Sequence, residues 1–310
     1  MSAKADEAEA DVCCANCGMA GVDDIKLEEC DGCDLVLCGS EWCRVVHREQ
    51  HDQERKKRQA ELLHDNKLFR EQERSHLGEC PLCFLPMPFD AEKSAFYSCC
   101  SNSVCNGCVY SHNVKSGSKT CPFCREPLGN DEEWEKRLMI RIKAGDPAAL
   151  SEMGTKRVNE GDYDTAFEYW TKAAELGDAE SHYQLSHLYM SGEGVEKDEE
   201  KELYHLEKAA IGGHPDARYN LGCYEGRNGN IERAVKHFII AATLGFEMSM
   251  KMLWAEFRDG NITKEDLDTT LRKHQAAIDE MRSPEREAAE VLRQKPAQRG
   301  WKWNGSDFVV

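Results

Sequence analysis

Residues 143–280 repeat one pattern of apolar and small positions about every 32 to 36 residues. The run KAAELG at 172–177 returns as KAAIGG at 208–213 and as IAATLG at 240–245. In each copy a large apolar residue precedes the alanine pair, and a glycine ends the run. The pattern predicts units of two antiparallel helices, whose alanines allow close approach and whose glycines cap helices. A single pair cannot bury its apolar face, so the units should stack into a short solenoid, whose concave side usually binds another protein.

Other stretches lack this pattern and predict the organisation of the chain. Residues 56–77 are charged, contain no Pro or Gly and carry Leu62, Leu63, Leu68 and Phe69, which predicts a connecting helix. Pro, Gly and acidic residues after 125 indicate a boundary. The expected segments are a cysteine-rich module at 13–55, the helix at 56–77, a second cysteine-rich module at 78–128, a linker at 129–142, the repeats at 143–280 and a disordered tail at 281–310.

Fifteen of the sixteen cysteines lie between Cys13 and Cys124. The first residues, MSAKADEAEADV, lack the basic and apolar character of an export signal, and no apolar run approaches about eighteen residues. We therefore expect an intracellular protein, cytoplasmic or nuclear, without a membrane partner. In a reducing compartment dense cysteine pairs indicate zinc rather than disulfides. The net charge of −17 makes nucleic acid an unlikely partner, because it repels a phosphate backbone.

The first module offers eight metal ligands: Cys14, Cys17, Cys30, Cys33, Cys38, Cys43, His47 and His51. Zinc takes four ligands in a tetrahedron, so eight ligands indicate two ions. The two histidines are four residues apart, and in a helix both would lie on one face and could bind the same ion.

The order of these ligands resembles the MYND zinc finger, a protein-interaction module. The resemblance implies one site of Cys14, Cys17, Cys38 and Cys43, and a second of Cys30 and Cys33 with the two histidines. The gap from Cys38 to Cys43 is one residue longer than in the family. The final cysteine of the family falls at Arg55, which cannot bind zinc, so the second site depends on both His47 and His51.

The second module carries eight thiols, which again suit two zinc ions and bring the expected total to four: Cys80, Cys83, Cys99, Cys100, Cys105, Cys108, Cys121 and Cys124. The runs CPLC, CNGC and CPFCR resemble the RING finger. The resemblance implies one site of Cys80, Cys83, Cys105 and Cys108, and another of Cys99, Cys100, Cys121 and Cys124. No residue separates Cys99 from Cys100, which makes the geometry tight. Alternatively one of the two is a spectator and His112 or water completes the site, or the second site binds its ion weakly.

RING fingers hold a ubiquitin-conjugating enzyme, and the resemblance places Leu82, Pro122 and Arg125 at contact positions for that enzyme or for ubiquitin. Val109 stands where many relatives carry a bulky aromatic side chain. One hypothesis is therefore a RING-type ubiquitin ligase whose repeats recruit a protein substrate. The alternative is a non-enzymatic protein–protein interaction adaptor with structural zinc fingers. A zinc-dependent hydrolase is disfavoured, because fully occupied tetrahedral sites leave no open coordination position.

The repeats resemble the Sel-one-like class, a relative of the tetratricopeptide repeat, and their fourth unit departs from the pattern as a terminal cap would. The order of the three modules resembles that of a group of diatom and related algal proteins. The expected fold is mainly α, with two small irregular α+β zinc-binding modules followed by a short helical-repeat (α/α) solenoid.

Overall fold

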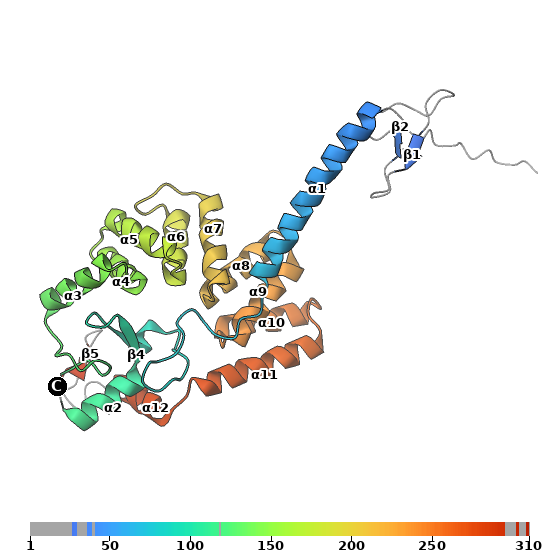
Figure 1. The fold of residues 1–310 in the computed structure, drawn as a ribbon. Helices are drawn as coiled ribbons and strands as arrows, with labels where there is room; N and C mark the ends of the chain where they lie inside the picture. Colours follow the sequence, from blue (N-terminus) through green and yellow to red (C-terminus); the bar gives the residue numbers. More distant parts are fainter. Residues whose placement is uncertain are drawn as a thin grey trace, which may run out of the picture. The chain divides into compact units, whose positions relative to one another are not determined.

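The computed structural model describes residues 27–29, 36–38, 41–117, 119–294, 302–303 and 308–309 (Figure 1). The chain divides into two units, residues 1–67 and 68–310. The described part is mainly α-helical, which confirms the expected fold class. Among the described helices, none is long and apolar enough to cross a membrane.

The first unit contains a short hairpin and most of a long helix. Strand β1 (Leu27–Glu29) pairs antiparallel with β2 (Val36–Cys38). Helix α1 (Glu41–Leu68) follows and ends at the first residue of the second unit. The sequence predicted a helix at 56–77. The helix starts earlier because 41–55 also lack Pro and Gly, and it ends earlier because the following residues form hydrogen bonds with the repeats instead.

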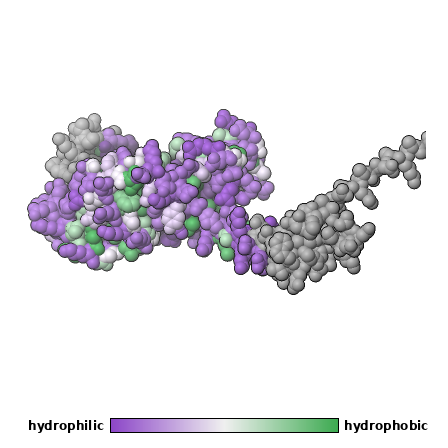
Figure 2. All heavy atoms as spheres, turned by 90° about the horizontal axis from the view of Figure 1, so that it is seen from above, coloured by the Kyte–Doolittle hydropathy of each residue, from purple (hydrophilic) through white to green (hydrophobic). Residues whose placement is uncertain are grey.

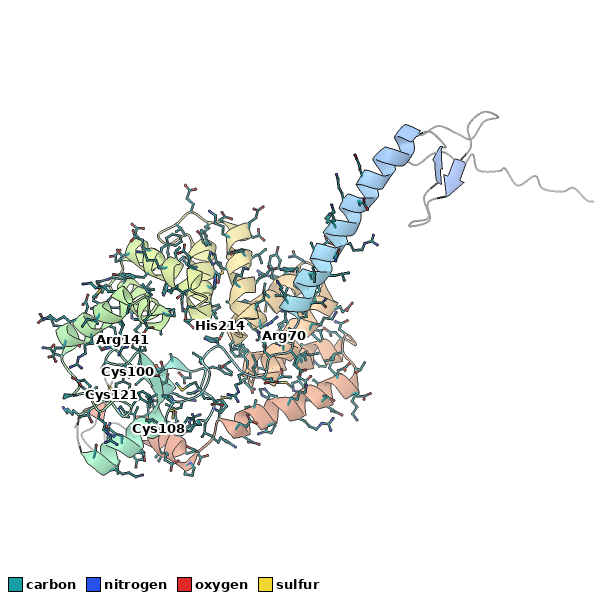
Figure 3. All side chains as sticks on the ribbon, viewed as in Figure 1. Arg70, Cys100, Cys108, Cys121, Arg141 and His214 are labelled. Atoms are coloured by element: carbon teal, nitrogen blue, oxygen red, sulfur yellow. The ribbon has the colours of Figure 1, made fainter. Side chains whose placement is uncertain are left out.

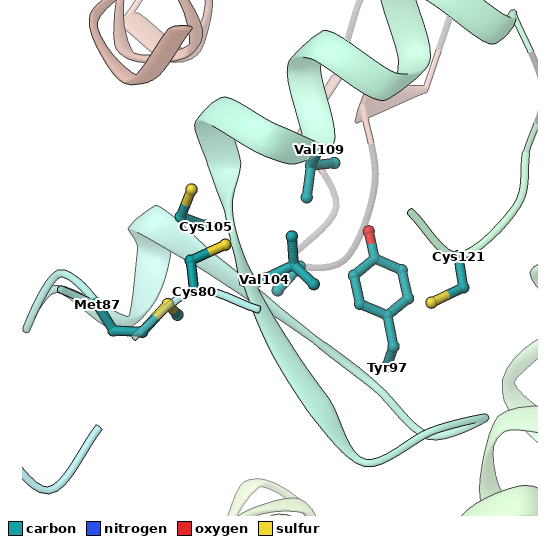
Figure 4. Packing of buried hydrophobic residues seen from close by; sticks show 8 residues of the cluster. Cys80, Met87, Tyr97, Val104, Cys105, Val109 and Cys121 are labelled. Atoms are coloured by element: carbon teal, nitrogen blue, oxygen red, sulfur yellow. The ribbon is translucent and has the colours of Figure 1, made fainter. Parts of the chain in front are cut away.

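The second cysteine-rich segment folds into a compact module at residues 79–128, which we call the cysteine module. It contains a 3-10 turn η1 (Ala91–Lys93), a hairpin of β3 (Ser94–Tyr97) and β4 (Asn102–Cys105), and helix α2 (Asn106–Ser116). Isolated bridges, Glu79 with Pro86 and Thr120 with Pro127, close its two ends. Its apolar core is small, as Figure 4 shows, and consists of Met87, Ala95, Tyr97, Val104 and Val109 together with cysteines.

The rest of the second unit is a helical array. Its elements are α3 (Asp131–Lys143), α4 (Pro147–Asn159), α5 (Tyr163–Glu175), α6 (Ala179–Ser191), α7 (Glu199–Ile211), α8 (Pro215–Arg227), α9 (Ile231–Thr243), α10 (Glu247–Arg258), α11 (Lys264–Glu280), α12 (Pro284–Gln294), β5 (Lys302–Trp303) and β6 (Phe308–Val309). Side chains of Asp146, Asp162, Asp178 and Asp198 accept backbone N–H groups at the starts of α4 to α7, which fixes where these helices begin.

Two helices lie where the sequence predicted none. Helix α3 occupies the expected linker, since Asn130 caps its start and Leu138 is buried against α4. Helix α12 occupies part of the expected disordered tail, so that expectation is wrong for Pro284–Gln294. Ala289 of α12 is buried where the helix packs against α2.

Small residues allow the repeat helices to pack closely. Trp170, Leu206 and Phe238 are buried at equivalent positions, each followed by its alanine pair. A Cβ atom on Gly154 would lie 2.4 Å from Trp170 Nε1, and one on Gly222 would lie 2.5 Å from Phe238 Cε1. Glycine at these positions therefore lets the next helix bring in a large aromatic ring.

The array holds the cysteine module and the linker that precedes it (69–78). Phe96 of β3 packs on the core of α3 and α4, and Phe89 lies edge-on to Phe246 at 6.3 Å between ring centroids. Arg141 of α3 donates to the carbonyl oxygen of Cys99 at 2.7 Å. In Figure 1 the helices from α3 to α12 curve around the module.

Substituting Gly222 with alanine should lower the free energy of unfolding by about 1 to 3 kcal/mol, because the added methyl collides with Phe238. Gly226→Ala in the same helix is the matched control, since its Cβ would meet Ala234 only at 3.7 Å. That control should be neutral or stabilise by up to about 1 kcal/mol through helix propensity. Urea titration measures the free energy of unfolding of both variants, and an equal change in the two would refute the packing argument.

Candidate metal centre

The cysteine module gathers its eight cysteines into two groups of four. The first cluster is Cys80, Cys83, Cys105 and Cys108, and the second cluster is Cys99, Cys100, Cys121 and Cys124. Within each cluster the sulfur atoms lie within 4.8 Å of one another. These are the two groups that the RING resemblance implies, and all eight thiols are free. Figure 3 shows one member of the first cluster and two of the second on the ribbon.

The sulfur–sulfur distances suit metal binding. Cys83 Sγ lies 3.7 Å from Cys105 Sγ, and Cys80 Sγ lies 3.9 Å from Cys108 Sγ. A disulfide requires about 2.05 Å. Four sulfurs around a tetrahedral zinc, each bonded at about 2.3 Å, lie about 3.8 Å apart. The donor set and its spacing therefore fit zinc in the first cluster.

The second cluster accommodates both adjacent cysteines. Cys100 Sγ lies 3.8 Å from Cys121 Sγ, and Cys99 Sγ lies 3.3 Å from Cys124 Sγ. The chain reverses directly after them at Ser101, which has a φ of 52°. This turn lets neighbouring residues reach one group of thiols, so the geometry supports a chelating pair rather than a spectator.

His112 is the residue that the alternative interpretation placed in the second site. Its Nε2 lies 3.0 Å from Thr120 Oγ1 and 3.4 Å from Ser116 Oγ. Both hydroxyls are therefore within hydrogen-bond distance of this ring nitrogen, and His112 belongs to neither cluster.

The first and last Cys-x-x-Cys pairs of the module, Cys80/Cys83 and Cys121/Cys124, are each held by a tight backbone turn. Phe84 N donates to Cys80 O at 2.9 Å, and Arg125 N donates to Cys121 O at 2.9 Å. Phe84 and Arg125 have φ values of 57° and 64°, in the left-handed region that non-glycine residues rarely adopt. Such strain persists only where the surroundings demand it, and here the turn brings both thiols of a pair to the same side.

Burial opposes thiolate formation at several of these cysteines. It raises the pKa of Cys121 to about 11, and burial together with hydrogen bonds to Cys124 and Cys121 raises the pKa of Cys99. In the first cluster, hydrogen bonds from Cys105 and Cys108 lower the pKa of Cys80 instead. A divalent cation would reverse the preference for the protonated form, because coordinated thiols lose their protons. Metal binding here should release protons.

Native mass spectrometry of the full chain should show one zinc ion fewer in either Cys99→Ser or Cys100→Ser than in the wild type. Each substitution removes one of four tetrahedral ligands from the same site. The control His112→Ala should keep the wild-type count. An unchanged count in one cysteine variant would identify that cysteine as a spectator.

Most of the first module falls outside the described residues. Cys14, Cys17, Cys30 and Cys33 are not described at all. For Cys38 in β2, and for Cys43, His47 and His51 in α1, only the backbone is described. Both histidines do lie in a helix four residues apart. The described residues thus contain clusters for two zinc ions, and the other two ions stay a prediction.

The three residues expected to contact a conjugating enzyme or ubiquitin lie within or directly after the first and last Cys-x-x-Cys pairs of the module. Leu82 is 37% exposed, Arg125 is exposed and Pro122 is half-buried. Val109 is buried in the core of the cysteine module and so contributes nothing to an exposed docking groove.

A third group of possible ligands joins the linker to the repeats and has no signal in the sequence, since its members are up to 138 residues apart in position. Glu180 Oε2 lies 3.3 Å from His76 Nε2 and 3.2 Å from His214 Nε2. The N–H of Ala217 donates to His214 Nδ1, which leaves the proton of a neutral His214 on Nε2. The two rings stack at 4.2 Å with 14° between their planes, so their lone pairs do not converge. This geometry disfavours a metal and suits a docking contact.

The contact of His76 and His214 with Glu180 shifts the pKa values of the carboxyl groups around it. Burial alone would raise the pKa of Glu180, but hydrogen bonds from His214 and His76 hold it well below its ordinary value. Burial and the neighbouring Glu180 carboxylate raise the pKa of Glu152 to about 7. Glu152 therefore opposes folding increasingly as the pH rises above its ordinary pKa, and the cost is complete once the native state also ionises it.

Glu152→Gln should stabilise the protein at pH 8 by up to about 3 kcal/mol, because the unfolded chain ionises this carboxyl at its ordinary pKa and the folded chain does so only near pH 7. The substitution stabilises because a carboxyl whose pKa is raised on folding lowers the stability of the native state as the pH rises from its ordinary pKa to about 7. Most of the gain should disappear at pH 5. Urea titrations at both pH values test this, with the exposed Glu168→Gln as control; a gain independent of pH would count against it.

Three consecutive stretches, residues 148–178, 179–214 and 215–246, match the family model described as Sel1 repeat. A Sel1 repeat protein from Oxalobacter formigenes is 30% identical, with 39% of this chain and 97% of that one covered and a TM-score of 0.36. The protein c5321, a protective antigen of uropathogenic Escherichia coli strains with an SLR fold, is 21% identical, with 64% of this chain and 42% of that one covered and a TM-score of 0.38. No curated protein matches the chain.

Proposed function

We propose that this chain, which belongs to the Sel1 repeat family, is a non-enzymatic adaptor that binds partner proteins and is stabilised by zinc. The observation that carries the proposal is the pair of four-cysteine clusters beside a helical-repeat array. Four thiolates complete a tetrahedral zinc site, as in structural rather than catalytic centres. Repeats of this kind generally mediate protein–protein interactions.

The partner would bind faces of the array that the chain itself leaves uncovered. The linker already lies on the repeats, where His76 N donates to Gly213 O and the Gln72 side chain donates to Ala210 O. Large exposed side chains such as Tyr204 and Trp254 lie on α7 and α10. Figure 2 shows a face on which hydrophilic residues dominate and hydrophobic ones are scattered, which suits a polar interface.

The proposal includes the first module as a MYND-like interaction finger with two further zinc ions. His47 and His51 would complete its second site with Cys30 and Cys33. Its support is the sequence pattern and the helical backbone around both histidines.

A RING-type ubiquitin ligase is the second candidate. One observation favours it: Leu82 and Arg125, at the contact positions of that family, are exposed and lie on the Cys-x-x-Cys turns. Val109 stands where many relatives carry a bulky aromatic side chain and is buried in the core, which counts against the ligase, so the adaptor remains the better supported function.

Autoubiquitination assays with a panel of conjugating enzymes separate the two functions. The adaptor predicts no ubiquitin transfer above the reaction without this protein. A ligase would transfer ubiquitin and lose most of that activity in Leu82→Ala and Arg125→Ala, but not in the control Val114→Ala, which alters an exposed residue of α2 outside the contact positions. Activity with that pattern would overturn the adaptor proposal.

A further inference from the structure

Helix α12 brings an arginine to the cysteine module from about 200 residues further along the chain. The helix packs closely on α2, where a Cβ atom on Gly107 would lie 2.7 Å from the backbone nitrogen of Arg286. Glycine at this position of the CNGC run therefore permits the contact. Ala289, one turn further along α12, is buried.

The guanidinium of Arg286 is fixed by several acceptors at once. Its Nη1 donates to Pro86 O and to Met281 O, both at 2.8 Å. Its Nη2 lies 3.6 Å from Cys83 Sγ and 3.4 Å from Leu85 O. Within the described part of the chain, Arg286 is paired with no carboxylate. The groups beside it that become anionic when they lose a proton are thiols of the first cluster, with Cys83 Sγ in contact.

The charge of a zinc site explains why a cation belongs here. Four thiolates around one divalent ion leave an excess of two negative charges, partly removed from water. A guanidinium that donates to a coordinated sulfur offsets part of this charge and fixes the ligand. Groups of this kind, placed just outside the ligands, typically change metal affinity by about 10- to 100-fold.

We infer that Arg286 holds the metal of the first cluster in place by donating to Cys83, and thereby couples helix α12 to that ion. The inference rests on the zinc site proposed above and adds a residue that is not itself a ligand. The competing explanation is that Arg286 merely anchors α12, through its bonds to Pro86 and Met281.

The two explanations predict different rates of zinc transfer from the full chain to a colorimetric chelator. Arg286→Gln should release one equivalent about 10-fold faster or more, because the thiolate loses its charged donor. Arg286→Lys should fall between Gln and wild type, since it keeps the charge without the planar fork. In a Cys83→Ser background, which lacks that ion, Arg286→Gln should have no further effect.

Arg293→Gln is the matched control. Arg293 anchors the same helix to the cysteine module through Glu92 and pairs with Glu290 within the helix at 2.9 Å, but it contacts no thiol. Release at the wild-type rate in this variant, with fast release in Arg286→Gln, supports a direct role. Equal acceleration in both variants, or none in Arg286→Gln, overturns the inference while leaving the zinc site intact. A wild-type chain without zinc in this cluster would overturn the proposed function as well.

Discussion

The spacing of the eight thiols is the constraint on which the cysteine module depends. Its apolar core holds only a few side chains, which is little for a segment of this size to fold around. Beside that core, the hairpin, α2 and the two Cys-x-x-Cys turns also meet at the thiols, where pairs of sulfur atoms approach to between 3.3 and 3.9 Å. Uncharged thiols gain little from such proximity, whereas thiolates around a cation gain a great deal. Under the proposed function, the fold of the module and the metal that it would bind form one energetic unit.

The array and the module support each other. Arg141 from α3 reaches the backbone of Cys99 in the second cluster, and Arg286 from α12 reaches Cys83 in the first. Between them, Phe96 and Phe89 pack on opposite parts of the array. A partner that binds the array would thus bind helices whose other side contacts the proposed zinc sites. This arrangement differs from independent modules joined by linkers.

The sequence predicted the parts of the fold that depend on local, repeated signals. The alanine pairs and the glycines after them predicted the helix pairs, and the resemblance to the RING finger implied the two groups of thiols. It did not predict α3 and α12, because these short helices gain their stability by packing on other elements rather than from a pattern of their own. Nor could it place His76 beside Glu180 and His214, a contact that depends entirely on how the linker crosses the repeats. The first module lies largely beyond the described residues, so its ligands remain as the sequence predicted them.

Amide hydrogen exchange of the full chain, measured by mass spectrometry before and after zinc removal with a chelator, tests the central claim most directly. If the thiol clusters and their ions hold the cysteine module together, peptides between Cys80 and Cys124 should lose protection. Peptides from α5 to α9 should keep it, because the repeats have their own apolar cores. Unchanged protection in the module would contradict the account, since it would show that the few apolar side chains suffice without metal.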